Sequence, residues 1–183
     1  MSDATLTKTN TYKIDEAHST VRFSVRHLMI SKVHGEISDI TGTVSYDPAN
    51  PEATVADVTI GLASLTTQQD QRDAHLKSAD FFNIEQFPNI TFKSTKVVSK
   101  GDGEFEVTGD LTMHGVTKAI TLKTEVSPEV ASPFGGFKIG VSATGVVNRE
   151  DYGMVYNQAL EAGGVMVGKE ISLQIDTELD RPA

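Results

Sequence analysis

The sequence predicts an all-β, antiparallel protein. Apolar and polar residues alternate along most of the chain, which is the period of a strand with one face in the core and one in water. Segments rich in Gly, Pro and Asp separate these runs at 47–53, 99–104 and 132–136. One stretch, 66–83, does not alternate. Such a sheet must cover its apolar face, so it either stacks on a second sheet or closes into a barrel, and alternation leaves both open.

The size and composition of the chain restrict its class. Its 183 residues fit one domain with a substantial core, expected over 12–180 and preceded by a flexible segment, 1–11. A net charge of −9 argues against nucleic-acid binding and against electrostatic docking on anionic lipid, because both require clustered Lys and Arg. The absence of cysteine excludes disulfides and thiolate chemistry. With no apolar run that could span a bilayer and no visible export signal, we expect no integral membrane segment and a cytoplasmic location.

Seven alternating segments predict strands, each with one face toward the interior. They are residues 19–27, 56–65, 89–98, 104–113, 118–126, 137–147 and 170–179. Asp102 and Gly103 carry the signature of a tight hairpin turn between two of them. Gly109 indicates a bend or bulge within its strand.

The non-alternating stretch predicts a short helix over 69–78, because its residues are good helix formers without Gly or Pro. Ser78 and Asp80 then suit a turn that leads to Phe81 and Phe82, and Pro88 directly precedes the next strand.

Five histidines raise the possibility of a metal site, but their spacing gives little support. His27 and His34 are seven residues apart, so on one continuous strand they would lie on opposite faces. We expect no metal and no cofactor, and we expect the histidines to make structural hydrogen bonds.

A hydrolytic triad can be written from Asp15, His18 and Ser19, which are close in sequence. Adjacent strand residues point to opposite faces, however, so His18 and Ser19 would not converge in a regular strand. A polar turn is the alternative interpretation of these residues. The chain also lacks a Gly-x-Ser-x-Gly elbow and glycine-rich phosphate loops, and it has no Trp to stack on sugars. We therefore expect no catalytic residue.

Two interpretations of the interior remain open at this point. In one, a sandwich has a filled core to which Phe81 and Phe82 belong. In the other, residues 69–87 cap a barrel with a lined cavity; about eight strands is the size at which a barrel can hold one small ligand.

Several long blocks of the sequence resemble the YceI-like family of bacterial lipocalin-like proteins, from about Tyr12 to about Glu178. The matching blocks are "YKIDEAHSTVRFSVRHLMISKVHGE", "RDAHLKSADFFNIEQFPNITFKS", "GDLTMHGVTKAITL", "VNREDYGM" and "NQALEAGGVMVGKEISLQIDTEL". Ile37 departs from the aromatic residue that is common in the family at this position, which would widen a cavity locally.

The resemblance implies an eight-stranded antiparallel lipocalin-like barrel with a short helical cover around an apolar tunnel. It implies binding of a long-chain amphiphile, such as a polyisoprenoid, an isoprenoid quinone or a fatty amide, by a carrier, reservoir or stress-related protein, and it makes a homodimer plausible. An enzyme acting on an isoprenoid lipid and a filled barrel without ligand are the alternatives.

Within such a tunnel, strand alternation selects the residues expected to form the wall. They are Phe23, Val25, Val58, Ile60, Leu62, Phe81, Phe82, Ile90, Phe92, Leu111, Met113, Ile139, Val141, Leu173 and Ile175. Candidates for headgroup contact are His27, Arg149 and Tyr152. His75 and Leu76 are expected on the cover, where the polar groups of 72–75 would bond to a neighbouring loop, and Phe87 is expected to re-enter the wall.

Overall fold

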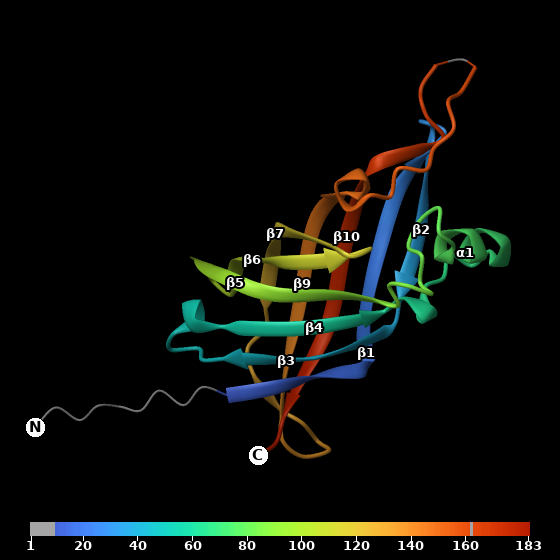
Figure 1. The fold of residues 1–183 in the computed structure, drawn as a ribbon. Helices are drawn as coiled ribbons and strands as arrows, with labels where there is room; N and C mark the ends of the chain where they lie inside the picture. The colour runs from blue at the N-terminus through green and yellow to red at the C-terminus, as the bar shows by residue number, and fades with distance from the viewer. Residues whose placement is uncertain (1–9, 162) are drawn as a thin grey trace, which may run out of the picture.

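The computed structural model describes residues 10–161 and 163–183 and shows a closed barrel of antiparallel strands (Figure 1). The strands follow the order β10-β1-β3-β4-β5-β6-β7-β9, and β9 pairs with β10 to close the ring. Outside the ring, β2 pairs with β1 and β8 pairs with β9. The strands are β1 Asn10–His27, β2 Ser31–Ile37, β3 Asp39–Tyr46, β4 Val55–Gly61, β5 Asn89–Gly101, β6 Glu104–Met113, β7 Val116–Val126, β8 Val130–Ala131, β9 Phe137–Asn148 and β10 Val167–Arg181.

The closed ring confirms the expected eight-stranded barrel and rules out the two-sheet sandwich. Of the segment expected to be flexible, residues 1–9 lie outside the described residues. Asn10 and Thr11 do not belong to a flexible segment, because they pair with Tyr46 and Ser45 of β3. The described helices are short, and none of them has the length and apolar character needed to cross a membrane.

An irregularity in β1 reverses which residues face the interior. Asp15 lies opposite Glu178 and Thr20 opposite Asp176, so β1 advances five residues while β10 advances two. Ile14 precedes this bulge and Val21 follows it. In an uninterrupted strand, residues seven positions apart lie on opposite faces, but here both face the cavity.

Within the same bulge, Ser19 Oγ donates to the Asp15 carbonyl oxygen at 2.6 Å, and Ala17 N donates to the Asp15 side chain at 3.0 Å. The local polar contacts expected from the sequence are therefore present, but they form a bulge within the continuous strand β1 and not a turn between two strands.

Three tight turns use residues in the left-handed conformation. Asp102 and Gly103 form the predicted turn between β5 and β6, with φ of 51° and 82°. His114 and Gly115 form a similar turn between β6 and β7.

The turn between β1 and β2 is different, because Leu28 and Met29 adopt φ of 50° and 64°. A bulky residue in this conformation costs about 1–2 kcal/mol. The sequence contains no turn signal here, so this turn was not among the predicted ones.

Gly109 marks an irregularity, as expected, but the extra residue is on the partner strand. Ser94 lies opposite Gly109 and Lys96 opposite Thr108, so β5 contains the bulge. Gly109 itself makes room for the ring of Phe92, because a Cβ there would lie 2.4 Å from the Phe92 Cζ atom.

We therefore expect Gly109→Ala to lower the free energy of unfolding by about 1–3 kcal/mol, the usual cost of overpacking a core. The new methyl group would also meet the Lys93 carbonyl oxygen at 2.5 Å, and backbone cannot rotate away. Urea denaturation measures the difference. Gly140→Ala is the matched control, since its Cβ would have no neighbour closer than 3.4 Å. Equal stability of the two variants would contradict the packing argument.

The predicted helix is present as α1, Asp70–Lys77, which lies beside β2 in Figure 1. Gln69 caps its first turn by accepting a hydrogen bond from the Arg72 backbone N–H at 2.6 Å, and Ser78 follows its last residue. The predicted bounds of 69–78 thus include the helix and both caps.

Polar side chains of α1 hold it to the preceding loop. Arg72 donates to the Thr67 hydroxyl at 2.7 Å and to the Thr67 carbonyl oxygen at 2.8 Å. Asp73 accepts from the Thr66 hydroxyl at 2.9 Å and from the Thr67 N–H at 2.8 Å. These bonds match the predicted role of the polar groups in 72–75, which was to fix the cover to a loop.

Candidate binding cavity

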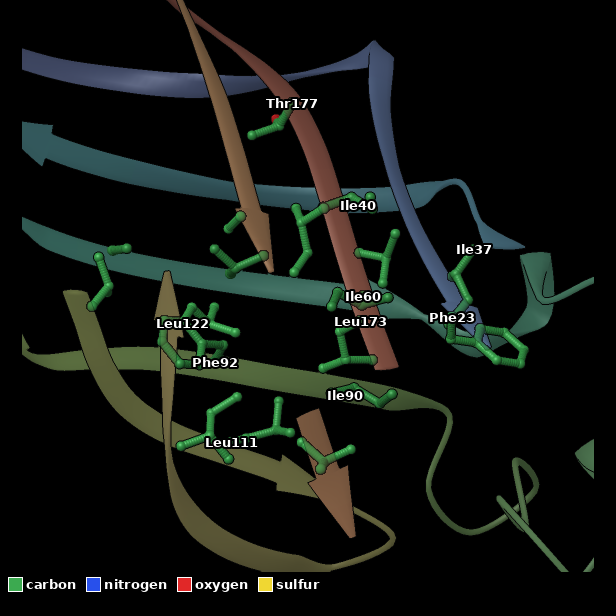
Figure 2. A pocket seen from close by; sticks show the side chains of 18 of the residues that line it. Phe23, Ile37, Ile40, Ile60, Ile90, Phe92, Leu111, Leu122, Leu173 and Thr177 are labelled. Atoms are coloured by element: carbon green, nitrogen blue, oxygen red, sulfur yellow. The ribbon is translucent and has the colours of Figure 1, made fainter. Parts of the chain in front are cut away.

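The barrel contains an apolar cavity of about 270 Å³. One water molecule needs only about 10–15 Å³ on the same measure, so the interior is not filled by the protein's own side chains. All eight barrel strands contribute to the wall. Figure 2 shows side chains from several strands directed toward a common interior, among them Phe23, Ile60, Phe92 and Leu173.

The wall is made of aliphatic and aromatic residues with few exceptions. Tyr46, Thr54, Thr124 and Thr177 contribute hydroxyl groups, and Arg149 is the only charged residue among the described residues that line the cavity. No histidine belongs to this set. The surface that faces the cavity is almost entirely apolar, so the cavity is suited to hydrocarbon.

The structure brings together most of the residues that alternation selected. The predicted residues that line the cavity are Phe23, Val25, Val58, Ile60, Phe81, Phe82, Ile90, Phe92, Leu111, Met113, Ile139, Val141, Arg149, Leu173 and Ile175. Ile37, at which the chain departs from the family pattern, is 3% exposed and also lies on the wall.

Leu62, His27 and Tyr152 lie off the wall. Leu62 is fully buried, but β4 ends at Gly61 and the chain turns into a 3-10 helix, Leu62–Ser64. His27 lies opposite Val167 next to an irregularity at the end of β1. Tyr152 is 1% exposed in a 3-10 helix, Arg149–Tyr152, and its hydroxyl has no hydrogen-bond partner among the described residues.

Several wall residues were missed because β3 was not among the predicted strands. Ile40, Val44 and Tyr46 line the cavity from β3. They are separated by even numbers of residues, so the alternation was present, but Gly42 and the threonines between them weakened the apolar signal.

Arg149 is held at the wall by backbone carbonyl groups. Its Nε donates to Gly168 at 2.9 Å, and its two terminal nitrogens donate to Met154 at 2.5 Å and Val167 at 3.3 Å. The side chain is 2% exposed, and burial lowers the pKa of the guanidinium while the nearby Glu150 charge opposes this shift. Three of the five N–H groups of an arginine are thus used, and two have no partner within the described part of the chain.

An aromatic cluster covers one part of the cavity. The rings of Phe81 and Tyr156 lie 5.1 and 4.9 Å from that of His75, both edge-on, and His75 Nε2 lies 2.8 Å from Asp80 Oδ2. Leu76, Phe81 and Phe82 line the cavity beneath this cluster. Phe87, which was expected in the wall, instead packs against His114 with ring centroids 5.1 Å apart.

Three of the five histidines make the structural contacts expected from the sequence. His18 Nδ1 lies 2.8 Å from Asp15 Oδ2, His75 contacts Asp80, and His114 Nδ1 lies 2.9 Å from the Tyr152 carbonyl oxygen.

Asp15, His18 and Glu178 are close enough to resemble a metal site. Lys138 Nζ already occupies this position, at 2.7 Å from Asp15 and 3.0 Å from Glu178. Hydrogen bonds from Lys138 and then His18 lower the pKa of Asp15 to about 2. The group is therefore an ion-pair cluster whose positive charge is supplied by the chain itself.

Comparison with known proteins places the chain in a family. A family model described as the YceI-like domain matches residues 12–179. The chain belongs to the YceI-like family. A UPF0312 protein of Staphylococcus aureus (strain MSSA476) is 40% identical to this YceI-like chain over 168 residues, which are 91% of this chain and 95% of that protein.

Solved structures share the fold of the YceI-like chain. The Campylobacter jejuni YCEI protein has a TM-score of 0.73 at 32% identity, covering 86% of this chain and 90% of that one. BcnA of Burkholderia cenocepacia has a TM-score of 0.79 at 20% identity, covering 90% and 98%. A polyisoprenoid-binding domain from Saccharophagus degradans has a TM-score of 0.69 at 16% identity, covering 96% and 100%.

Proposed function

We propose that this YceI-like protein binds a long-chain amphiphile, such as a polyisoprenoid, an isoprenoid quinone or a fatty amide, as a carrier or reservoir. The observation that carries the proposal is the closed barrel around a cavity of about 270 Å³ whose facing surface is almost entirely apolar. The fold shared with a polyisoprenoid-binding domain supports it.

The hydrocarbon tail would supply most of the binding free energy. Burial contributes about 0.8 kcal/mol for each methylene group, so a dozen buried carbons outweigh one charge-assisted hydrogen bond of roughly 1.5–3 kcal/mol. Ordering of the tail and loss of translational freedom offset part of this gain. The tail therefore sets the affinity, and the headgroup sets orientation and selectivity.

Arg149 is the residue that would orient the polar end of the ligand. It is one of the residues that line the cavity, and two of its N–H groups have no partner among the described residues. Because the surface that faces the cavity is almost entirely apolar, the guanidinium would have to turn toward the ligand to donate to an oxygen acceptor such as a quinone carbonyl or a hydroxyl group. His27 and Tyr152, the other headgroup candidates, lie off the wall, so neither is proposed to contact the headgroup.

The test is organic extraction of the protein purified from its native host, followed by mass spectrometry. We expect a co-purifying amphiphile with a long apolar tail. Its removal should lower the melting temperature, because a ligand present at a hundred times its dissociation constant stabilises the folded state by about 2.7 kcal/mol. Readdition of the extract should restore the original melting temperature.

A mock extraction of an unrelated protein from the same cells controls for lipid that adheres nonspecifically. If the extract contains no amphiphile, and if neither prenols nor quinones shift the melting temperature when they are added, the binding proposal is wrong.

A further inference from the structure

The turn between β1 and β2 exposes three consecutive apolar side chains, Leu28, Met29 and Ile30, which we call the apolar tip. Their exposed fractions are 36%, 57% and 79%. The turn is closed by a hydrogen bond from Ile30 N to the His27 carbonyl oxygen at 3.1 Å. Turns of this geometry favour Asn and Gly, whereas here Leu28 and Met29 adopt the left-handed conformation. Two bulky residues in a strained, exposed turn point to a role other than folding.

Two cations flank the apolar tip. Arg26 on β1 and Lys32 on β2 are exposed and lie directly opposite each other. Within the ranges 10–161 and 163–183, neither has a carboxylate oxygen at salt-bridge distance. Like charges placed directly across a pair of strands are destabilising, so an anionic group bound between Arg26 and Lys32 would relieve their repulsion.

The sequence around the tip is depleted of acidic residues. The chain contains 25 Asp and Glu residues, yet the segment 17–35 contains none. This segment itself therefore carries an excess of positive charge despite the net charge of −9 of the chain. Arg22 is already paired with Asp176 of β10 at 3.0 Å, which leaves Arg26 and Lys32 as the cations next to the tip. Charges farther away than about 10 Å are screened at 0.1 M salt, so the total charge does not decide what the tip can bind.

The tip is continuous with the strands that line the cavity. Leu28 N donates to the Met166 carbonyl oxygen at 2.8 Å, and His27 lies opposite Val167. Val25, three residues before the tip in the chain, and Val167, opposite His27, both line the cavity. In Figure 1 this end of β1 and β2 lies at the same end of the molecule as the loop that precedes β10.

We propose that the apolar tip docks the protein on a phospholipid bilayer that contains anionic lipid. The three apolar side chains enter the boundary between headgroups and acyl chains, while Arg26 and Lys32 contact phosphate groups. A second copy of the chain fits less well, because a two-fold symmetric contact through the tip would bring its cations close to those of the partner. Docking does not require an occupied cavity, so this proposal goes beyond ligand binding.

The test is co-sedimentation with vesicles of phosphatidylglycerol and phosphatidylcholine in equal parts, compared with vesicles of phosphatidylcholine alone. We expect wild type to bind the anionic vesicles about 25-fold more strongly, since each of two cations near an anionic surface contributes about fivefold. Arg26→Gln/Lys32→Gln should lose this preference. Leu28→Asn/Met29→Gly should bind at least about tenfold more weakly than wild type, because it removes two of the three apolar side chains of the tip.

The melting temperature of the tip variant, Leu28→Asn/Met29→Gly, shows whether that variant is folded. Asn-Gly suits the left-handed turn, so Leu28→Asn/Met29→Gly should melt at or above the temperature of wild type while it loses vesicle binding. Phe134→Asn is the matched control, because Phe134 is a 94% exposed apolar residue on the turn between β8 and β9. It should bind vesicles as wild type does.

Equal vesicle binding by wild type and the tip variant would overturn the proposal, as would the absence of wild-type binding to either vesicle. The proposal would also be overturned if neither protein bound vesicles and light scattering showed a dimer in wild type but a monomer in the tip variant. The tip would then be a contact between two copies of the chain. Val58→Phe, which obstructs the cavity, should still sediment with vesicles; loss of binding in this variant would mean that lipid is extracted into the cavity and the tip does not dock.

Discussion

Replacement of Arg149 with alanine is expected to lower the free energy of unfolding by about 3 kcal/mol or more. The guanidinium donates to the carbonyl groups of Met154, Val167 and Gly168, and it is 2% exposed. Each carbonyl group left without a donor in a buried position costs about 1–3 kcal/mol. The loss would loosen the junction between the end of β9 and the start of β10. Urea denaturation with an unchanged slope is the measurement.

Arg22→Ala is the matched control, because it removes the same type of side chain from an exposed ion pair, in which Arg22 lies 3.0 Å from Asp176. Its loss should cost about 0–1 kcal/mol. Arg149→Lys should be intermediate, since a lysine has three donors but lacks the planar geometry of the guanidinium. If Arg149→Ala were no less stable than Arg22→Ala, the bonds to the backbone would not have the structural role assigned to them.

The wall of the cavity could be predicted because it follows from the pleat of a strand. Val58 and Ile60 on β4, and Leu173 and Ile175 on β10, face inward for the same reason that they alternate with polar residues. This inference needs only a local period. It holds wherever the strand continues without interruption.

The same inference failed where the chain left the regular strand. Alternation continues through Leu62, but the strand ends at Gly61, and Leu62 begins a 3-10 helix in which its N–H donates to the Pro88 carbonyl oxygen at 2.9 Å. That contact is with a residue far away in the sequence, so it is not visible in the local pattern. The turn at Leu28 and Met29 was missed for a different reason. Its residues are not those that the left-handed backbone conformation favours, so the sequence contains no turn signal there.

The position of Arg149 could not be derived from the sequence either. Its three carbonyl partners lie 5 to 19 residues away, in the loop after the 3-10 helix and at the start of β10. The pairing of β9 with β10 brings them together around one guanidinium. The sequence identified Arg149 as a candidate for headgroup contact, and the structure adds that the same residue holds two strands.

Affinity for prenols is expected to increase steeply with chain length, from geraniol to farnesol to geranylgeraniol. Each isoprene unit adds five carbons, which on burial contribute up to about 4 kcal/mol at 0.8 kcal/mol per carbon. Ordering of the added unit offsets part of this gain, so we expect an increase of at least about tenfold per unit. Displacement of a fluorescent fatty-acid probe measures the series. The increase should stop at the length that fills the cavity.

Val58→Phe tests whether that limit is set by the cavity. Val58 lies on the wall opposite Phe92 in register, and a second ring beside it would occupy space that the tail needs. The variant should bind geranylgeraniol at least about tenfold more weakly than wild type but geraniol with nearly the same affinity, because only the longer tail reaches the lost volume. Val58→Ala is the control that enlarges the cavity, and it should retain the full length dependence.

Two outcomes of the prenol series would mean that burial of hydrocarbon is not the main source of the binding free energy. One is equal binding of all three prenols, and the other is a larger change in affinity on exchange of the alcohol for a quinone than on a change of tail length.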